Sequence, residues 1–266
     1  MPFPEAPRVI YKKNVLEQVI CQIRFPPILR IDAETPFEFQ ECVRKQLPDY
    51  KLTYDESDDV LPQSLSKNLP SEMREFLSLS GTRRHQFHSK EKTWTVSLTR
   101  DFVALETNQY KRWEDFRERL KLVVKTLFQI YEPAYLTRIG LRYQNVIDRR
   151  RLGLEGVEWR DLLADFVLGQ FARDETLNLV VEHHGRTLVK LNDDGDLVRI
   201  EYGLVIDSAG DTSNKLYLLD HDFYIDKETE SDERDIVSRL DTYNALNRRL
   251  FNWGITQRLR DAMGPT

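Results

Sequence analysis

The chain has 266 residues, with 39 Lys and Arg against 44 Asp and Glu, which gives a formal net charge of −5. Hydrophobic residues make up 40% and charged residues 31%, and this composition excludes a membrane-spanning, a collagen-like and a wholly disordered protein. The mild acidity argues against a general attraction to nucleic acid but leaves a local basic patch open.

The N-terminus and the cysteines predict a reduced, cytoplasmic, soluble protein. Residues 1–14 hold three prolines and no apolar signal segment, so we expect an extended arm there. No stretch approaches the ~18 apolar residues that a membrane span needs. Cys21 and Cys42 lack metal-site spacing and are too few for a disulfide framework. Cys21 alternates with apolar residues and is expected to be a small buried side chain.

The first 50 residues predict a strand followed by a helix. Apolar and polar residues alternate over 15–25, which is typical of a half-buried strand, and two prolines end it. The sequence Thr35-Pro36-Phe37-Glu38 has the pattern of a helix start, with Thr35 as the N-cap. We therefore expect a helix over 35–47.

The middle of the chain predicts a long loop, three strands and a long helix. Residues 51–80 are rich in acidic and turn residues, with a short helix expected over 71–79. Short turns then separate strands expected over 83–89, 93–99 and 102–107, which indicates antiparallel hairpins. Over 113–131 apolar residues recur every three or four positions, which predicts an amphipathic helix.

The second half repeats this order of elements. We expect a strand over 135–147, a helix over 158–171, and a closing helix over 235–263 that is broken near Gly254. Asn192–Gly195 is a strong hairpin turn signal. The remaining strands are expected over 177–184, 187–191, 197–206 and 215–226.

This repetition predicts an internal duplication, with one half over 1–134 and a similar half over 135–266, together forming one compact unit. At an offset of 120 residues the apolar positions of the two opening strands coincide, and at an offset of 123 those of the two long helices do. The predicted fold class is α+β. Each half is expected to be an antiparallel sheet with helices packed on one face, which leaves the other face for solvent or a partner.

The side chains of that free face follow from the alternation along the strands. They include Gln18, Gln22, Thr95, Ser97, Glu182 and Glu201. An ordinary solvated sheet face is the favoured explanation of such a polar surface. The sharper hypothesis is a groove with a positive end at Arg24, Arg138 and Arg142 and an acidic end at Asp220 and Asp222. The predicted partner-binding residues are Arg24, Arg138, Arg142, Gln144, His184, Arg199, Asp220 and Asp222.

Catalytic motifs are missing, so no catalytic residue, metal ligand or cofactor is predicted. No phosphate-binding glycine loop, zinc-protease motif or nucleophile elbow occurs. Asp220 and Asp222 share a face and could bind Mg²⁺, but an ion pair with Arg138 or Arg142 is favoured. His183 and His184 point to opposite faces and cannot ligate one metal. His221 falls on the apolar side, where a hydrogen-bonded core histidine is expected.

Five segments together carry a resemblance to a known group of proteins. They are YKKNVLEQVICQIRFPPILRI, YKRWEDF, LTRIGLRYQNVI, LLDHDFYI and LFNWGITQRLRDAMG, in this order along nearly the whole chain. They resemble a sporadically distributed family of uncharacterised prokaryotic proteins of about 260 residues with no established activity. The resemblance therefore transfers no chemistry. Many members carry a histidine near the position of Asn244, so its absence argues against a catalytic histidine there. Scattered occurrence implies accessory, defence or toxin–antitoxin loci.

Three functions remain as hypotheses. The first is a non-catalytic binding or regulatory protein that holds a protein partner on the polar sheet face or on the acidic loop 226–235. No membrane contact is expected, and homo-oligomerisation is left open. The second is a nucleic-acid binder with a saddle-like duplicated sheet, an analogy with the TATA-binding architecture at the level of fold. The third is a metal-dependent enzyme that uses Asp220, Asp222 and His184. The missing motifs lean away from an enzyme.

Overall fold

The computed structural model describes residues 2–55, 82–169, 180, 183–206, 214–230 and 232–266. Within them the fold is α+β, and its strands form one nine-stranded sheet in the order β2-β3-β4-β5-β1-β6-β9-β8-β7. Every neighbouring pair is antiparallel. The strands are β1 (Leu16–Arg24), β2 (Asp49–Asp55), β3 (Thr82–His88), β4 (Trp94–Leu98), β5 (Phe102–Thr107), β6 (Arg138–Ile147), β7 (His183–Lys190), β8 (Leu197–Ile206) and β9 (Lys215–Ile225).

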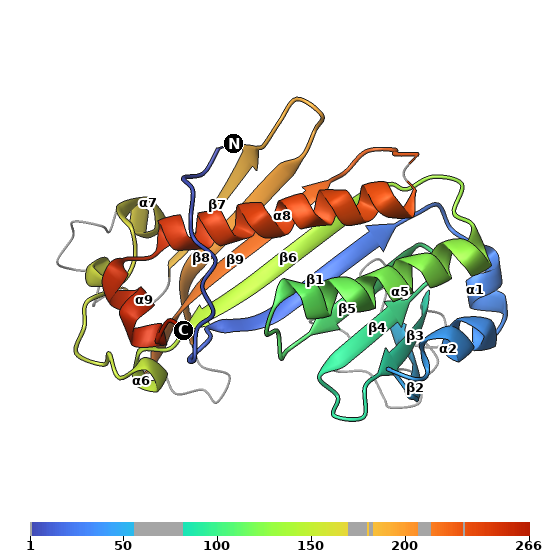
Figure 1. Ribbon diagram of the computed structural model, residues 1–266, viewed down its shortest axis with the longest axis horizontal. Helices are drawn as coiled ribbons and strands as arrows, with labels where there is room; N and C mark the ends of the chain where they lie inside the picture. The colour runs from blue at the N-terminus through green and yellow to red at the C-terminus, as the bar shows by residue number, and fades with distance from the viewer. Residues whose placement is uncertain (1, 56–81, 170–179, 181–182, 207–213, 231) are drawn as a thin grey trace, which may run out of the picture.

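The helices described are two long ones and several short ones (Figure 1). The long helices are α5 (Trp113–Tyr131) and α8 (Glu233–Gly254). The short ones are α1 (Leu29–Ala33), α2 (Phe37–Val43), α6 (Arg149–Leu152), the 3₁₀ helix η1 (Trp159–Asp161), α7 (Asp165–Leu168) and α9 (Gln257–Met263). No helix in the described ranges is long and apolar enough to cross a membrane.

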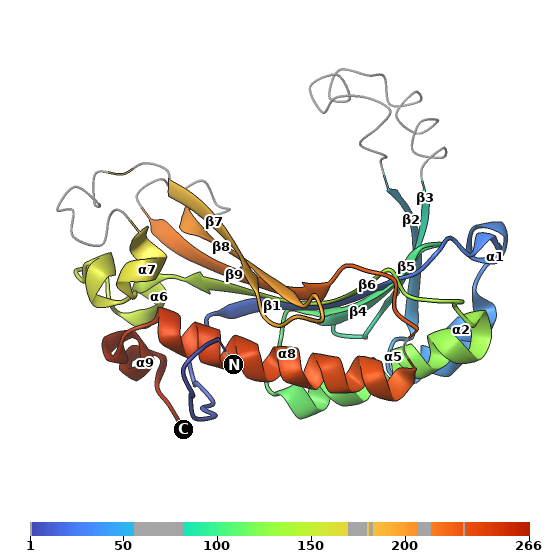
Figure 2. The same cartoon turned by 90° about the horizontal axis from the view of Figure 1, so that it is seen from above.

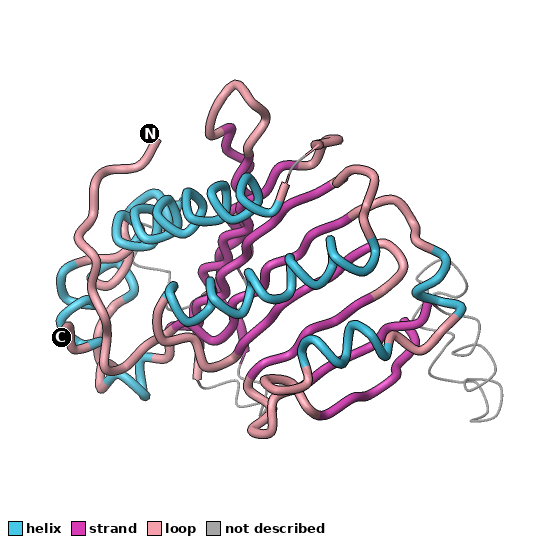
Figure 3. Tube along the Cα trace, turned by 45° about the vertical axis from the view of Figure 1, so that its right-hand side comes forward, coloured by secondary structure: helices cyan, strands magenta, loops and turns pink. Residues whose placement is uncertain are grey.

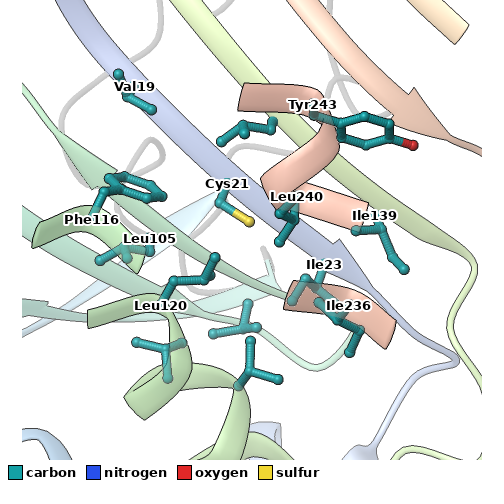
Figure 4. Packing of buried hydrophobic residues seen from close by; sticks show 14 of the residues in the cluster. Val19, Cys21, Ile23, Leu105, Phe116, Leu120, Ile139, Ile236, Leu240 and Tyr243 are labelled. Atoms are coloured by element: carbon teal, nitrogen blue, oxygen red, sulfur yellow. The ribbon is translucent and has the colours of Figure 1, made fainter. Parts of the chain in front are cut away.

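Strands β1 and β6 pair at the centre of the sheet. Their register places Val19 opposite Tyr143, Cys21 opposite Leu141 and Ile23 opposite Ile139. These alternate positions are at most 1% exposed, as the alternation in the sequence predicted. The inward face of the two central strands therefore forms the middle of the hydrophobic core (Figure 4).

Helices α5 and α8 run across the same face of the sheet (Figures 1 and 2). The apolar stripe of α5 includes Phe116 and Leu120, and that of α8 includes Ile236 and Leu240, all of them buried. One hydrophobic cluster contains these side chains together with those of β1 and β6. Figure 2 shows that both ends of the sheet bend away from the two helices. The opposite side of the sheet is therefore the inner side of this bend, and we call it the concave face.

A second hydrophobic cluster lies beneath the short helices α6, α7 and α9. Its largest side chains are Trp159 and Tyr217, whose rings pack at 5.3 Å. The N-terminal arm runs beside the C-terminus, where Tyr11 forms a β-bridge with Pro265 (Figure 3). Phe3 at the start of the arm is 5% exposed and packs near Trp253, so the arm is part of the packed structure.

Four expectations about local structure are wrong. Thr35 is not the N-cap of α2, because the helix begins at Phe37 after Pro36 with no side-chain cap. Strand β2 occupies part of the expected loop. The helix expected over 158–171 is replaced by η1 and α7, because backbone groups of residues 162–164 bond to the junction of α8 and α9. The break expected between 184 and 187 is absent, because β7 pairs continuously with β8.

Other elements follow the sequence pattern. Helix α5 has the expected bounds, and the closing helix is interrupted after Gly254. The short helix expected over 71–79 and most of the strand expected over 177–184 lie outside the described residues.

Candidate partner-binding face

The polar residues of β6, β8 and β9 are brought together by the strand register. Arg142 on β6 lies opposite Asp222 on β9, and Asp222 lies opposite Arg199 on β8. In the next row Gln144 lies opposite Asp220, which faces Glu201. Because alternate residues of a strand share a face, these side chains all stand on the concave face, as the sequence predicted.

Arg142 binds Asp220 diagonally rather than its direct neighbour Asp222. Its Nε lies 2.8 Å from Oδ1 and its Nη2 lies 2.5 Å from Oδ2, which is a two-point contact. Gln144 donates to the same carboxylate at 3.0 Å. The hydrogen bond to Asp220 raises the pKa of the Arg142 guanidinium. The negative charge of Asp220 is thereby balanced by Arg142, and its side chain is only 4% exposed.

Asp222 is held between two arginines from different strands. Arg138 donates Nη2 to its two oxygens at 3.1 and 2.9 Å, and Arg199 donates Nη2 at 2.5 Å. The Arg138 guanidinium also lies 4.0 Å from the ring centre of Tyr224. The side chain of Asp222 is 8% exposed and that of Arg138 is 14% exposed. This three-residue network joins β6, β8 and β9 into one polar cluster.

The expected acidic end of the face is wrong. Asp220 and Asp222 are buried, and the guanidinium groups of Arg138, Arg142 and Arg199 bind their oxygens. Side chains of Arg142 and Arg199 remain 38% and 31% exposed. A carboxylate that is buried away from water needs a partner of opposite charge. Here the arginines that lie nearer to solvent compensate the charge of the two aspartates. Around this cluster the surface offers guanidinium groups, with the two aspartates beneath.

His184 and Arg24 lie at the edges of the predicted site. His184 on the outer strand β7 is exposed and lies 4.0 Å from Glu201, which Arg186 approaches at 3.6 Å. Arg24 is exposed at the end of β1 and donates to Gln22 at 3.2 Å. Thr95 and Ser97 are buried although they were expected to be free, and Glu182 lies outside the described residues.

Sequence reasoning missed Glu106, which lies on β5 and is separated from this cluster by β1. It stands opposite Ile20 and Thr95 and accepts a hydrogen bond from Gln18 at 3.2 Å. Burial raises the pKa of its carboxyl group. The alternation of residues 102–107 places Glu106 with Ala104 on the polar side, so this signal was present in the sequence.

The paired aspartates are held in ion pairs. Both carboxylates are engaged by arginines, the ion-pair arrangement that the sequence favoured. No group of three or more His, Cys, Asp or Glu in the described parts of the chain is arranged to hold a metal ion. His221 is 3% exposed and contacts Asn247 Oδ1 through Nδ1 at 2.9 Å. This confirms a hydrogen-bonded core histidine.

Comparison with known proteins adds no relative to this picture. A scan against protein-family models and a search of curated proteins both give no match. The role of the concave face is therefore inferred from its geometry.

Proposed function

We propose that the protein is a non-catalytic binding or regulatory protein that holds a protein partner on the concave face. The observation that carries the proposal is the arrangement of arginines above buried aspartates on β6, β8 and β9. Each guanidinium is oriented by a carboxylate from a neighbouring strand. Groups that are fixed before binding lose less conformational entropy when a partner arrives.

The proposed partner presents acidic or hydrogen-bond-accepting groups. Arg142 and Arg199 keep about a third of their side-chain surface in solvent, and Arg186 keeps 61%. A guanidinium retains several donors when one carboxylate is bound, so it can accept a second anionic group. Complementary charge of this kind sets association rate and specificity more than affinity.

We further propose that the two halves are a duplication, with each half an antiparallel sheet covered by helices on one face. Each half begins with a central strand, β1 or β6, which is followed by short helices and a run of antiparallel strands. The last strand of that run pairs with the central strand, and a long helix then follows. The pairing of Cys21 with Leu141, flanked symmetrically by Val19 with Tyr143 and Ile23 with Ile139, agrees with an offset of 120 residues. A Cα superposition of Leu16–Tyr131 on Arg138–Gly254 in an experimental structure tests this.

Charge reversal on the exposed part of the face tests the binding proposal. Arg24→Glu with Arg186→Glu changes two exposed arginines and leaves the buried network intact. We expect the tagged wild-type chain to retain one dominant partner from cells of its source and this variant to lose most of it. The matched control is Arg44→Glu with Arg258→Glu, which makes the same charge change at the C-terminal end of α2 and on α9. Equal retention by both variants would overturn the placement.

The resemblance of the chain to a sporadically distributed family of uncharacterised prokaryotic proteins supports a place in an accessory, defence or toxin–antitoxin locus. The partner is then expected to be encoded beside this chain. Coexpression of the neighbouring genes with the tagged chain tests that expectation, because the partner recovered should be one of their products.

Nucleic acid is the second candidate, and the curved sheet with outward arginines favours it (Figure 2). The presence of Glu106 and Glu201 on the same face opposes it, because carboxylates repel phosphate groups. Fluorescence anisotropy with mixed-sequence duplex and single-stranded DNA and RNA decides between a nucleic acid and a protein as the partner. An affinity for DNA or RNA that falls steeply as the salt concentration rises would favour nucleic acid as the partner.

A further inference from the structure

A hollow lies on the helix-covered side of the sheet, between the N-terminal arm, residues 110–113 and α8. Its volume is about 430 Å³, within the range that pockets for small molecules occupy. It does not share the arginine–aspartate network of the concave face. A ligand here would therefore bind independently of the proposed partner.

The charge of this hollow has one sign. Its lining includes five cationic residues and no Asp or Glu: Arg8, Lys12, Lys111, Arg112 and Arg248. Two of the five are paired with carboxylates outside the lining, Arg8 with Glu114 and Arg112 with Asp115. Lys12, Lys111 and Arg248 form no ion pair within the described part of the chain. In a protein of net charge −5, such a local excess of cations is a specific feature.

Arg248 is the most unusual of these cations. Its Nε is buried and has no hydrogen-bond partner among the described residues. A buried donor without a partner is destabilising, and more so when it belongs to a charged group. By contrast, the hollow between α5 and α8 is lined by both signs, including Arg117, Lys121 and Asp241. The hollow around Arg248 therefore differs from that hollow in having cations and no carboxylate in its lining.

The neighbouring asparagines add neutral donors. Asn244 Oδ1 accepts from Tyr143 Oη at 3.0 Å and from Tyr110 Oη at 3.5 Å. Asn247 Oδ1 faces His221 Nδ1 at 2.9 Å. Both carbonyl oxygens are thus occupied, while both side-chain amide nitrogens lack a partner within the described residues. On one stretch of α8, Asn244, Asn247 and Arg248 all have donors left over.

We propose that this hollow binds a small organic anion. Its phosphate or carboxylate group would accept hydrogen bonds from Arg248 and the asparagine amides, since charge-assisted bonds of this kind are the strong ones. Its apolar body would lie against the rings of Trp113, Tyr110 and Phe251, which also line the hollow. Burial of such a body supplies affinity that an inorganic ion lacks.

Titration calorimetry and thermal shift test the proposal with three probes on the full chain. Phenyl phosphate and benzoate carry the two anionic groups on an aromatic ring, and benzyl alcohol is the uncharged control. We expect at least one of the two anions to bind and raise the melting temperature, and benzyl alcohol not to. Whichever anion binds more tightly identifies the preferred acidic group. Absence of binding by both anions, or equal binding of benzyl alcohol, would overturn the proposal.

Variants of α8 place the binding in this hollow. Arg248→Gln removes the charge, and Asn244→Asp keeps an acceptor for the tyrosines while it adds a negative charge. Each is expected to weaken the anion by about tenfold or more, the effect of losing one charge-assisted hydrogen bond. Arg258→Gln on α9 is the matched control, with a 54% exposed side chain outside the hollow, and should bind as wild type does. Unchanged binding in both α8 variants would contradict the site.

Discussion

Asp222 shows how burial and charge are balanced at a single residue. Its carboxylate is almost fully removed from water, and two guanidinium groups from β6 and β8 take the place of water. Removal of one member of a buried ion pair leaves the others without compensation, which is more destabilising than the pair itself is stabilising.

We expect Asp222→Asn to lower the free energy of unfolding by about 2–4 kcal/mol, because Arg138 and Arg199 lose their shared carboxylate. Urea denaturation followed by circular dichroism measures it. Asp193→Asn is the control, since Asp193 pairs with Lys190 in the exposed hairpin turn and its loss should leave stability unchanged. A shift no larger than that of the control would contradict a structural role for the network.

Buried histidines predict a pH dependence. Burial lowers the pKa of His221 below its ordinary value, and it lowers that of His85 as well. A histidine with a lowered pKa in the folded state stays neutral when folded and protonates more readily when the chain is unfolded. Its contribution to stability is present above the unfolded pKa of about 6.5 and is lost as the pH falls below that value.

The free energy of unfolding is therefore expected to decrease between pH 7 and pH 5. His221→Asn keeps a donor for Asn247 but cannot titrate, so its decrease over that interval should be smaller. Urea denaturation at both pH values measures the difference. An equal decrease in the variant would show that His221 is not among the groups responsible.

At the scale of elements, Gly203 sets the approach of β7 to β8. An added Cβ at Gly203 would overlap the carbonyl oxygen of His183, a backbone atom that cannot move without shifting the strand. We expect Gly203→Ala to weaken the pairing of β7, the strand at the end of the sheet. Amide hydrogen exchange over β7 and the rest of β8 should accelerate. Gly156→Ala, where an added Cβ meets nothing within 4 Å, is the control and should exchange as wild type does.

The elements also show what a sequence can and cannot predict. Periodicity alone located α5 and the central strands, because each presents one strongly apolar face to the core. It failed over residues 158–169, where most apolar side chains pack into a local cluster and the backbone bonds to the junction of α8 and α9. That bonding depends on chain segments about 90 residues away, which no local pattern reports.

The same limit applied to the candidate site. Alternation placed Arg138, Arg142 and Asp222 on one face, but the strand order decides which of them meet. Because β9 lies between β6 and β8, arginines from both sides reach its aspartates. The predicted acidic end disappeared for this reason. Glu106 on β5 shares the polar side by the same alternation, so its position could also have been predicted from the sequence.

The whole molecule consists of one curved sheet, with α5 and α8 on one side and the arginine-bearing concave face on the other (Figure 2). Site-specific photo-crosslinking in cells of the source tests most directly that this face holds the partner. A photoreactive side chain at Leu188, exposed and in register with Arg199, is predicted to give a protein adduct. The same group at Thr242, exposed on α8, is predicted to give none. Adducts from Thr242 without any from Leu188 would contradict the account.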